Sequence, residues 1–175
     1  MKTVTQRNSP QAIGRALIGL TLTLTSVVIL PAAATPQTPH LTAQPNHLAQ
    51  AIQNLQQSNQ RWIQIDLPRQ RLIAWEGERP VYAVIVSTGK PSTPTPTGSF
   101  AIQTRHRYAR MQGADYDVPD VPYTMYYSGN YAIHGAYWHN RFGTPVSHGC
   151  INVAVNHARW LFNWAKVGTP VVVHR

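Results

Sequence analysis

The chain has 175 residues and a formal net charge of +9, from fifteen Lys and Arg against six Asp and Glu. This length suits one domain, and 43% apolar with only 12% charged residues indicates a packed globular chain rather than a disordered one. The single cysteine, Cys150, excludes an internal disulfide framework and any metal site built from several thiolates.

Residues 1–34 have the order of a secretory signal peptide. Three basic residues precede the apolar run Ala16–Leu30, and a Pro-Ala-Ala-Ala segment follows it. The run has 15 residues and is interrupted by Thr and Ser, which is short for a membrane span of about 18 residues or more. We expect cleavage, with a retained anchor as the alternative. The prediction is therefore an exported protein of the periplasm or cell wall that meets the membrane only transiently.

The remaining charge is spread along the chain. Residues 1–34 hold three of the basic residues and none of the acidic ones, so residues 35–175 keep a net charge of +6. The only local cluster is Arg105–Arg110, whereas a nucleic-acid-binding domain more often shows a continuous basic stripe or a recognised module. The sequence predicts no nucleic-acid partner and favours a basic surface that attracts an anionic extracytoplasmic polymer.

Residues 35–60 are predicted to form a linker and a short helix. The segment 35–47 is rich in Pro and polar residues, as linkers are. From Leu48 to Gln60, apolar residues recur at helical spacing among glutamines, which predicts a short amphipathic helix.

Residues 61–175 are predicted to form one mostly β domain. Short runs rich in β-branched and aromatic residues alternate with turns, as expected for strands. A helix near the end has Asn156 as its expected N-cap and stops at Gly168. The predicted strands are Trp62–Asp66, Arg71–Trp75, Val81–Val86, Ser99–Gln103, Tyr131–Ile133 and Val171–His174.

The lone cysteine is either a buried, inert residue or a reactive one. Cys150 lies in the segment Ser147–Asn152 (SHGCIN), directly after a glycine. Gly149 permits backbone conformations closed to other residues, and successive N–H groups in such a turn can bind an oxyanion. These neighbours favour a nucleophilic thiol.

A nucleophilic cysteine needs a base, and His134 lies sixteen residues upstream at the end of a strand-like run. An imidazole near the thiol would favour the thiolate through an ion pair and would move the proton in acyl transfer. His139, His148 and His157 also lie in this region, so spacing alone does not choose the base.

The two elements Ile133–Gly135 and Ser147–Asn152 together closely resemble the active-site signature of the L,D-transpeptidases, the YkuD-type catalytic domain of bacterial cell-wall enzymes. The resemblance extends to a glycine-proline loop at 86–100 and a closing strand at 168–172, and it spans residues 61–175. It implies a β-sandwich catalytic domain with one or two short helices, acting as a cysteine-dependent acyltransferase without a cofactor or metal.

The resemblance also implies roles for the residues around the thiol. Cys150 is the nucleophile, and His134 is its base, oriented by the main-chain carbonyl of Gly135. Ser147, His148 and Gly149 are supporting residues of the motif, and the N–H groups of Gly149 and Cys150 are expected to form the oxyanion hole.

The expected substrate-binding residues are less closely tied to the motif. Asn152 occupies a position where many members of the family have Arg, so either Asn152 or Arg141 is expected to meet a substrate carboxylate. Tyr123 and Tyr126 lie in the segment that resembles one wall of the family's cleft.

The implied reaction is peptidoglycan L,D-transpeptidation, with stem peptides as partners. The thiolate attacks the third residue of a tetrapeptide stem, terminal D-alanine leaves, and an amine of a neighbouring stem completes a 3→3 cross-link of cell-wall biogenesis. Water as acceptor would make an L,D-carboxypeptidase, and a lipoprotein lysine would make an anchoring enzyme. The sequence does not choose among these acceptors or set the oligomeric state.

Two alternatives come from other classes of protein. A zinc hydrolase would use His134, His148 and Cys150, although a His-x-Cys pair in a tight glycine turn is poor geometry for two ligands of one ion. A noncatalytic wall-binding module would leave Cys150 unreactive. Three carboxylates at positions 115, 117 and 120 suggest a divalent-ion site, but their Gly- and Pro-rich setting is typical of turns.

Overall fold

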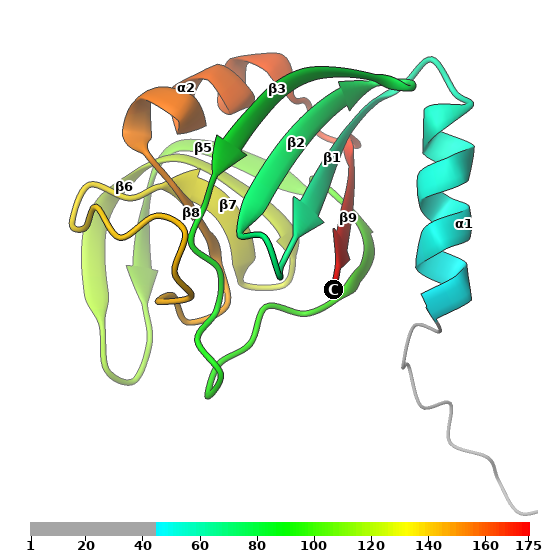
Figure 1. The fold of residues 1–175 in the computed structure, drawn as a ribbon. Coiled ribbons are helices and arrows are strands. Elements are labelled where there is room, and N and C mark those ends of the chain that lie inside the picture. The colour runs from blue at the N-terminus through cyan, green and yellow to red at the C-terminus, as the bar shows by residue number, and fades with distance from the viewer. Residues whose placement is uncertain (1–44) are drawn as a thin grey trace, which may run out of the picture. The chain divides into compact units, whose positions relative to one another are not determined.

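The computed structural model describes residues 45–175, so the predicted signal peptide and most of the predicted linker lie outside the described residues. This part of the chain contains two helices and nine strands (Figure 1). No helix within it is long and apolar enough to cross a membrane. The elements are α1 Pro45–Gln56, β1 Arg61–Asp66, β2 Arg71–Glu76, β3 Arg79–Ile85, β4 Gly98–Ala101, β5 Thr104–Gln112, β6 Asp117–Ser128, β7 Tyr131–Gly135, β8 Ile151–Val153, α2 Val155–Trp164 and β9 Pro170–His174.

The strands form two mixed sheets that share one core. One sheet has the order β3-β2-β1-β9-β4, and the other has the order β5-β6-β7-β8. The pairs β1/β9 and β7/β8 are parallel, and the other neighbours are antiparallel. Ile63 and Leu72 of the first sheet join Met125 and Ile133 of the second in a single buried cluster. The predicted mostly β sandwich with two short helices is confirmed.

Strand β1 shows how the sequence pattern produces the first sheet. Ile63 and Ile65 alternate along the strand and belong to the core cluster, because successive side chains of a strand point to opposite faces. On the other face, Trp62 stacks on Trp75 of β2 with ring centroids 5.3 Å apart, and its indole N–H donates to the Gly77 carbonyl at 2.9 Å. Both faces of β1 are therefore covered.

Strands β5, β6 and β8 were not predicted, and the sequence of β5 explains why it was missed. It contains the basic cluster Arg105–Arg110 and has no alternation of apolar and polar residues. It pairs only with β6, at the edge of its sheet, where charged side chains are common because they discourage pairing with other chains. The basic cluster is therefore an edge strand.

Both helices differ from the predicted bounds. Helix α1 begins at Pro45 rather than Leu48, and it ends at Gln56 because the Ser58 hydroxyl donates to the Leu55 carbonyl at 2.7 Å. Helix α2 begins at Val155, so Asn156 is inside the helix and the prediction of Asn156 as the N-cap is wrong. Helix α2 packs on β6 and β7 through Ala158, Leu161 and Trp164.

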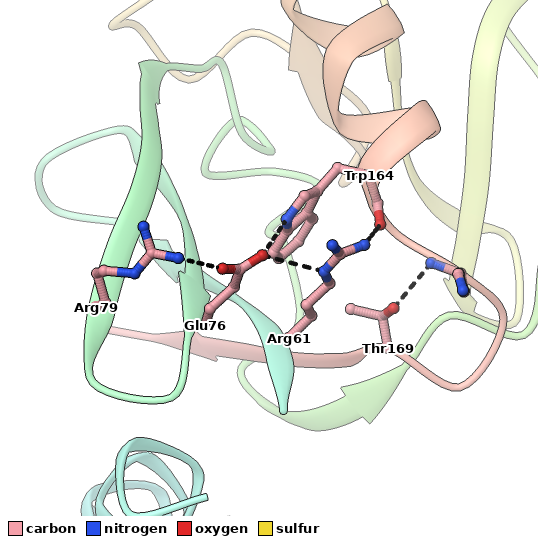
Figure 2. Close-up of polar contacts among 6 residues, drawn as sticks. Arg61, Glu76, Arg79, Trp164 and Thr169 are labelled. Carbon is pink, nitrogen blue, oxygen red and sulfur yellow. Dashed lines mark hydrogen bonds and ion pairs between the residues drawn. The ribbon is translucent and has the colours of Figure 1, made fainter. Parts of the chain in front are cut away.

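The C-terminal end of α2 is joined to the first sheet around Glu76 (Figure 2). The Glu76 carboxylate accepts hydrogen bonds from Arg61 of β1, from Arg79 of β3 and, at 3.4 Å, from the Trp164 indole. Arg61 also donates to the Trp164 carbonyl at 3.1 Å. Exposed ion pairs contribute little to stability, so the buried side chains of α2, more than this network, hold the helix in place.

We predict that Leu161→Ala lowers the free energy of unfolding by about 2–5 kcal/mol, because Leu161 is fully buried and its truncation leaves a cavity under α2. The matched control Val167→Ala, at a position 63% exposed, should change it by less than about 0.5 kcal/mol. Urea unfolding followed by tryptophan fluorescence measures both values. Equal effects of the two substitutions would contradict the position of Leu161 in the core.

Candidate active site

Strands β7 and β8 bring the predicted nucleophile and base together. They pair in parallel with His134 beside Asn152, and Cys150 directly precedes β8. Because side chains alternate along a strand, Cys150 shares a face with Asn152 and therefore with His134. All three residues line one cavity of about 280 Å³.

The orientation of His134 is set by its own strand end. The imidazole is buried, and its Nδ1 lies 3.0 Å from the carbonyl oxygen of Gly135. A carbonyl can only accept a hydrogen bond, so Nδ1 carries the proton and Nε2 keeps the lone pair of a base. The contact with the Gly135 carbonyl that the family resemblance implies is present.

The same burial keeps the imidazole neutral. Burial lowers the pKa of His134 to about 4, and the contact with the Gly135 carbonyl opposes this shift only in part. The Trp138 ring stacks on the imidazole with centroids 5.7 Å apart, so it adds to the apolar surroundings. At neutral pH His134 is therefore an uncharged base.

The thiol of Cys150 is also held in its neutral form. It is only partly exposed, and its Sγ lies 3.7 Å from the carbonyl oxygen of Asn130. Burial raises the pKa of the thiol to about 11, and a backbone contact with Ala132 opposes the shift in part. Both shifts favour a neutral thiol beside a neutral imidazole, which differs from the ion pair that the sequence predicts.

The turn before Cys150 is closed by Ser147. The Ser147 hydroxyl donates to the Cys150 carbonyl at 2.6 Å and accepts from the Gly149 N–H at 3.0 Å. Gly149 has φ +111°, and a Cβ there would collide with the Tyr131 ring, so only glycine fits.

This arrangement corrects the predicted oxyanion hole. The Gly149 N–H is already bonded to Ser147, so the prediction of Gly149 as a donor is wrong for this conformation. The Cys150 N–H has no acceptor among residues 45–175 and is the donor that remains.

The glycine-proline loop packs behind the same turn. The Thr95 hydroxyl donates to the Gly149 carbonyl at 2.8 Å and accepts from the Gly89 N–H at 2.9 Å. The Lys90 N–H donates to the Ser147 carbonyl at 3.0 Å. A Cβ on Gly89 would lie 2.9 Å from the Gly149 Cα, so the close approach of the two segments requires glycine at position 89.

The two candidates for binding a substrate carboxylate, Asn152 and Arg141, both line the cavity. They differ in whether the side chain already has a partner within the protein. The Asn152 side chain is buried and lies 2.9 Å from Nε2 of His139. Arg141 is exposed, and its guanidinium forms no ion pair with the residues that the structure describes. Arg141 is therefore the cation available to a ligand.

The two predicted donor-site tyrosines lie in different places. Tyr123 is buried in the core with its ring 5.8 Å from Phe162 of α2, and it does not line the cavity. Tyr126 is half-buried and pairs with Ala132, the residue of β7 level with Cys150. Burial raises the pKa of Tyr126, with a smaller contribution from Cys150, and Tyr126 does not line the cavity.

Tyr116 and Trp138 line the cavity and were not among the predicted site residues. Trp138 follows His134 closely in sequence, and this nearness was its only signal. Tyr116 comes from the turn between β5 and β6, which folds over the cavity because the two strands pair. No sequence pattern connects this turn with Cys150. Three further lining residues are Met111, Val118 and Val146.

The other histidines have partners that leave His134 the best-placed base. His157 lies on α2, where its Nδ1 is 2.7 Å from the Tyr82 hydroxyl, and it does not line the cavity. His139 contacts Asn152 through Nε2, and His148 contacts Asp115 through Nε2 at 3.0 Å.

The residues proposed for a zinc hydrolase, His134, His148 and Cys150, do not form a metal-binding site. Within residues 45–175, no group of three or more His, Cys, Asp or Glu is placed to hold a metal ion. Asp117 pairs with Arg110, and Asp115 contacts His148, so these two carboxylates have other partners.

Comparison with known sequences identifies similar proteins. The family model for the YkuD domain, the L,D-transpeptidase catalytic domain, matches residues 60–173. L,D-transpeptidase 1 of Mycobacterium tuberculosis is 36% identical over 100 residues, which cover 50% of this chain and 39% of that protein. L,D-transpeptidase 2 of the same species is 33% identical over 106 residues, covering 53% and 26%. The matches thus span about two fifths or less of these relatives' length.

Solved structures give the same result. The catalytic domain of the Enterococcus faecium L,D-transpeptidase is similar with a TM-score of 0.61 and 29% identity, covering 67% of this chain and 98% of that one. The L,D-transpeptidase LdtMt1, solved in complex with imipenem, has a TM-score of 0.61 and 28% identity, covering 65% and 58%.

We predict that the rate of Cys150 alkylation by iodoacetamide rises steadily with pH toward a midpoint of about 11. The thiolate is the reacting form, and below that pH each unit of pH should raise its amount about tenfold. Mass spectrometry of the intact protein from pH 6 to pH 11 measures the rate. A constant, fast rate between pH 5 and pH 8 would show a preformed ion pair and contradict the neutral pair.

Proposed function

The chain belongs to the YkuD family of L,D-transpeptidase catalytic domains, and on this premise we propose that it is a cysteine-dependent acyltransferase acting on peptidoglycan stem peptides. The observation that carries the proposal is that Cys150 and His134 line one cavity, with the Nε2 lone pair of His134 left free by the contact between Nδ1 and the Gly135 carbonyl. A nucleophile, a base and a group that orients the base are the parts that acyl transfer needs.

In the first half of the reaction, His134 Nε2 takes the proton of the Cys150 thiol as sulfur attacks the carbonyl carbon of the third residue of a tetrapeptide stem. The carbonyl oxygen becomes an oxyanion, toward which the Cys150 N–H is the available donor. The intermediate collapses to a thioester, and the departing terminal D-alanine takes the proton from His134 at its amine nitrogen.

In the second half, an amine of a neighbouring stem attacks the thioester. His134 Nε2 takes a proton from that amine, the carbon–sulfur bond breaks, and the proton returns to the thiolate of Cys150. The product is a 3→3 cross-link, and the enzyme regains its neutral pair. Water in place of the amine gives an L,D-carboxypeptidase, and a lipoprotein lysine gives an anchoring transpeptidase, because the first half is common to all three.

The export signal and the division of the chain are part of the same proposal. Residues 1–34 direct the chain out of the cytoplasm, residues 35–60 join the leader to the domain, and residues 61–175 are the catalytic domain. Peptidoglycan lies outside the cytoplasmic membrane, so the periplasm or cell wall is where the substrate is available. The net charge of +6 on residues 35–175 supports contact with an anionic polymer.

We predict that residues 35–175 release D-alanine from tetrapeptide muropeptides and that Cys150→Ala abolishes this release, because no acyl-enzyme can form. Mass spectrometry should show the thioester adduct on the wild-type protein and cross-linked or trimmed products. The control variant Ser99→Ala, on an exposed position of β4, should retain full activity.

The same assay separates the other classes of protein. Activity retained in Cys150→Ala but lost with a chelator would favour the zinc hydrolase. Binding to wall fragments without any turnover would favour the noncatalytic module.

We predict that Arg141→Gln raises KM for the tetrapeptide donor about tenfold with little change in kcat, as expected when a charge-assisted contact equal in the ground and transition states is lost. The control Arg159→Gln removes an equally exposed charge from α2. A KM unchanged in Arg141→Gln, or changed equally in both variants, would rule out a specific carboxylate contact at Arg141.

A further inference from the structure

Three segments meet at the ring of His148, on the rim of the Cys150 cavity. His148 belongs to the turn before the cysteine, and its Nε2 lies 3.0 Å from Asp115 Oδ2 in the turn between β5 and β6. The same nitrogen lies 3.2 Å from Lys90 Nζ in the glycine-proline loop. Tyr116, next to Asp115, packs on the imidazole with ring centroids 4.6 Å apart. Tyr116 and His148 both line the cavity.

The two partners of Nε2 make opposite demands. An imidazole nitrogen presents either one N–H or one lone pair in the plane of the ring. The Asp115 carboxylate only accepts, so its bond needs a proton on Nε2. The Lys90 ammonium only donates, so its bond needs the lone pair. The two bonds therefore cannot form together, and the proton on His148 decides which of them exists.

We propose that Asp115, His148 and Lys90 form a proton-dependent clasp that positions the β5–β6 turn, with Tyr116, over the cavity of Cys150. When His148 is protonated, Nε2 donates to Asp115 and the turn is held over the cavity. When His148 is neutral with its lone pair on Nε2, Lys90 takes the bond and Asp115 is released. Asp115 and Lys90 are thus positioning residues that act through His148.

The charges around His148 support this assignment. The hydrogen bond with His148 is the largest cause that lowers the pKa of Asp115, with a smaller contribution from the charge of Lys90. The Asp115 side chain is 64% exposed, so solvent screens the pair and the clasp shifts the turn by a moderate factor, about two- to fivefold. The charged or titratable groups that face His148 are Asp115 and Tyr116 from the β5–β6 turn and Lys90 from the loop.

The consequence for the enzyme rests on the proposed function, in which a stem peptide binds in the cavity that Tyr116 and Cys150 both line. A proton on Nε2 would hold the turn closed, and its loss would open the cavity to larger substrates. The clasp itself changes how easily a reagent reaches the Cys150 thiol, so it can be tested without any turnover of peptidoglycan.

The test compares two maleimides of different size on the folded protein. N-ethylmaleimide and fluorescein maleimide react with the same thiolate, so the ratio of their rates cancels the ionisation of Cys150 and reports access alone. In the wild-type protein, the rate of the large reagent relative to the small one should rise about two- to fivefold as the buffer is changed from acidic to alkaline. A ratio independent of pH would overturn the proposal.

Two substitutions should act in opposite directions. Asp115→Asn removes the charge that holds the turn, so the ratio should stay at its high-pH value throughout. Lys90→Met removes the competing donor, so the ratio should stay near its low-pH value. The matched control is Asp117→Asn, which breaks the Arg110 ion pair in the same hairpin without touching His148 and should leave the wild-type profile unchanged.

The outcomes discriminate the clasp from a general loosening of the hairpin. If Asp115→Asn and Asp117→Asn change the ratio equally, the hairpin responds to any lost ion pair and the proposal fails. If Asp115→Asn and Lys90→Met shift the ratio in the same direction, competition for Nε2 is refuted. A stem-peptide assay that shows no turnover would contradict the proposed function while leaving the alkylation result, and the clasp, standing.

Discussion

The parallel pairing of β7 with β8 is the constraint on which the candidate site depends. A parallel pair needs a long connection, and here the segment between Gly135 and Ile151 supplies it and carries Trp138, His139 and Arg141 into the cavity wall. The register that places His134 beside Asn152 also sets Cys150 on the same face. A shift of one residue would turn the thiol to the opposite face, so the hydrophobic residues Ile133 and Ile151, which fix the register from the core side, also protect the chemistry.

Burial gives the site its chemical character. It lowers the pKa of His134 and raises that of Cys150, so it favours the uncharged form of both groups. A neutral pair costs less to bury than an ion pair. The contact between Nδ1 of His134 and the Gly135 carbonyl leaves the imidazole lone pair on Nε2.

The support around the pair comes from close backbone contacts rather than from bulky side chains. Gly89 allows the glycine-proline loop to touch the cysteine turn, and the Thr95 hydroxyl bonds backbone groups of both segments. The Ser147 hydroxyl bonds backbone groups within the cysteine turn. The hairpin β5–β6 closes the third side of the cavity with Tyr116. The closely packed backbone segments and the β5–β6 turn thus lie on different sides of the Cys150 thiol.

Local features of the sequence determined the family and most strands, because strand alternation and the Ser147–Asn152 motif each involve only a few neighbouring residues. They also predicted Cys150 and His134 as the reacting pair, and both line one cavity. The same reasoning did not predict β5, whose residues are polar as in an edge strand. It also did not predict the hydrogen bond from the Gly149 N–H to Ser147, which makes this N–H unavailable to an oxyanion. It placed Tyr123 at the substrate, although the packing of α2 buries that ring. The tertiary structure alone decided the cavity wall and the charge state of the pair. The cavity wall and the charge state both depend on which distant segments exclude water from Cys150 and His134. Burial by distant segments cannot be predicted from the local sequence.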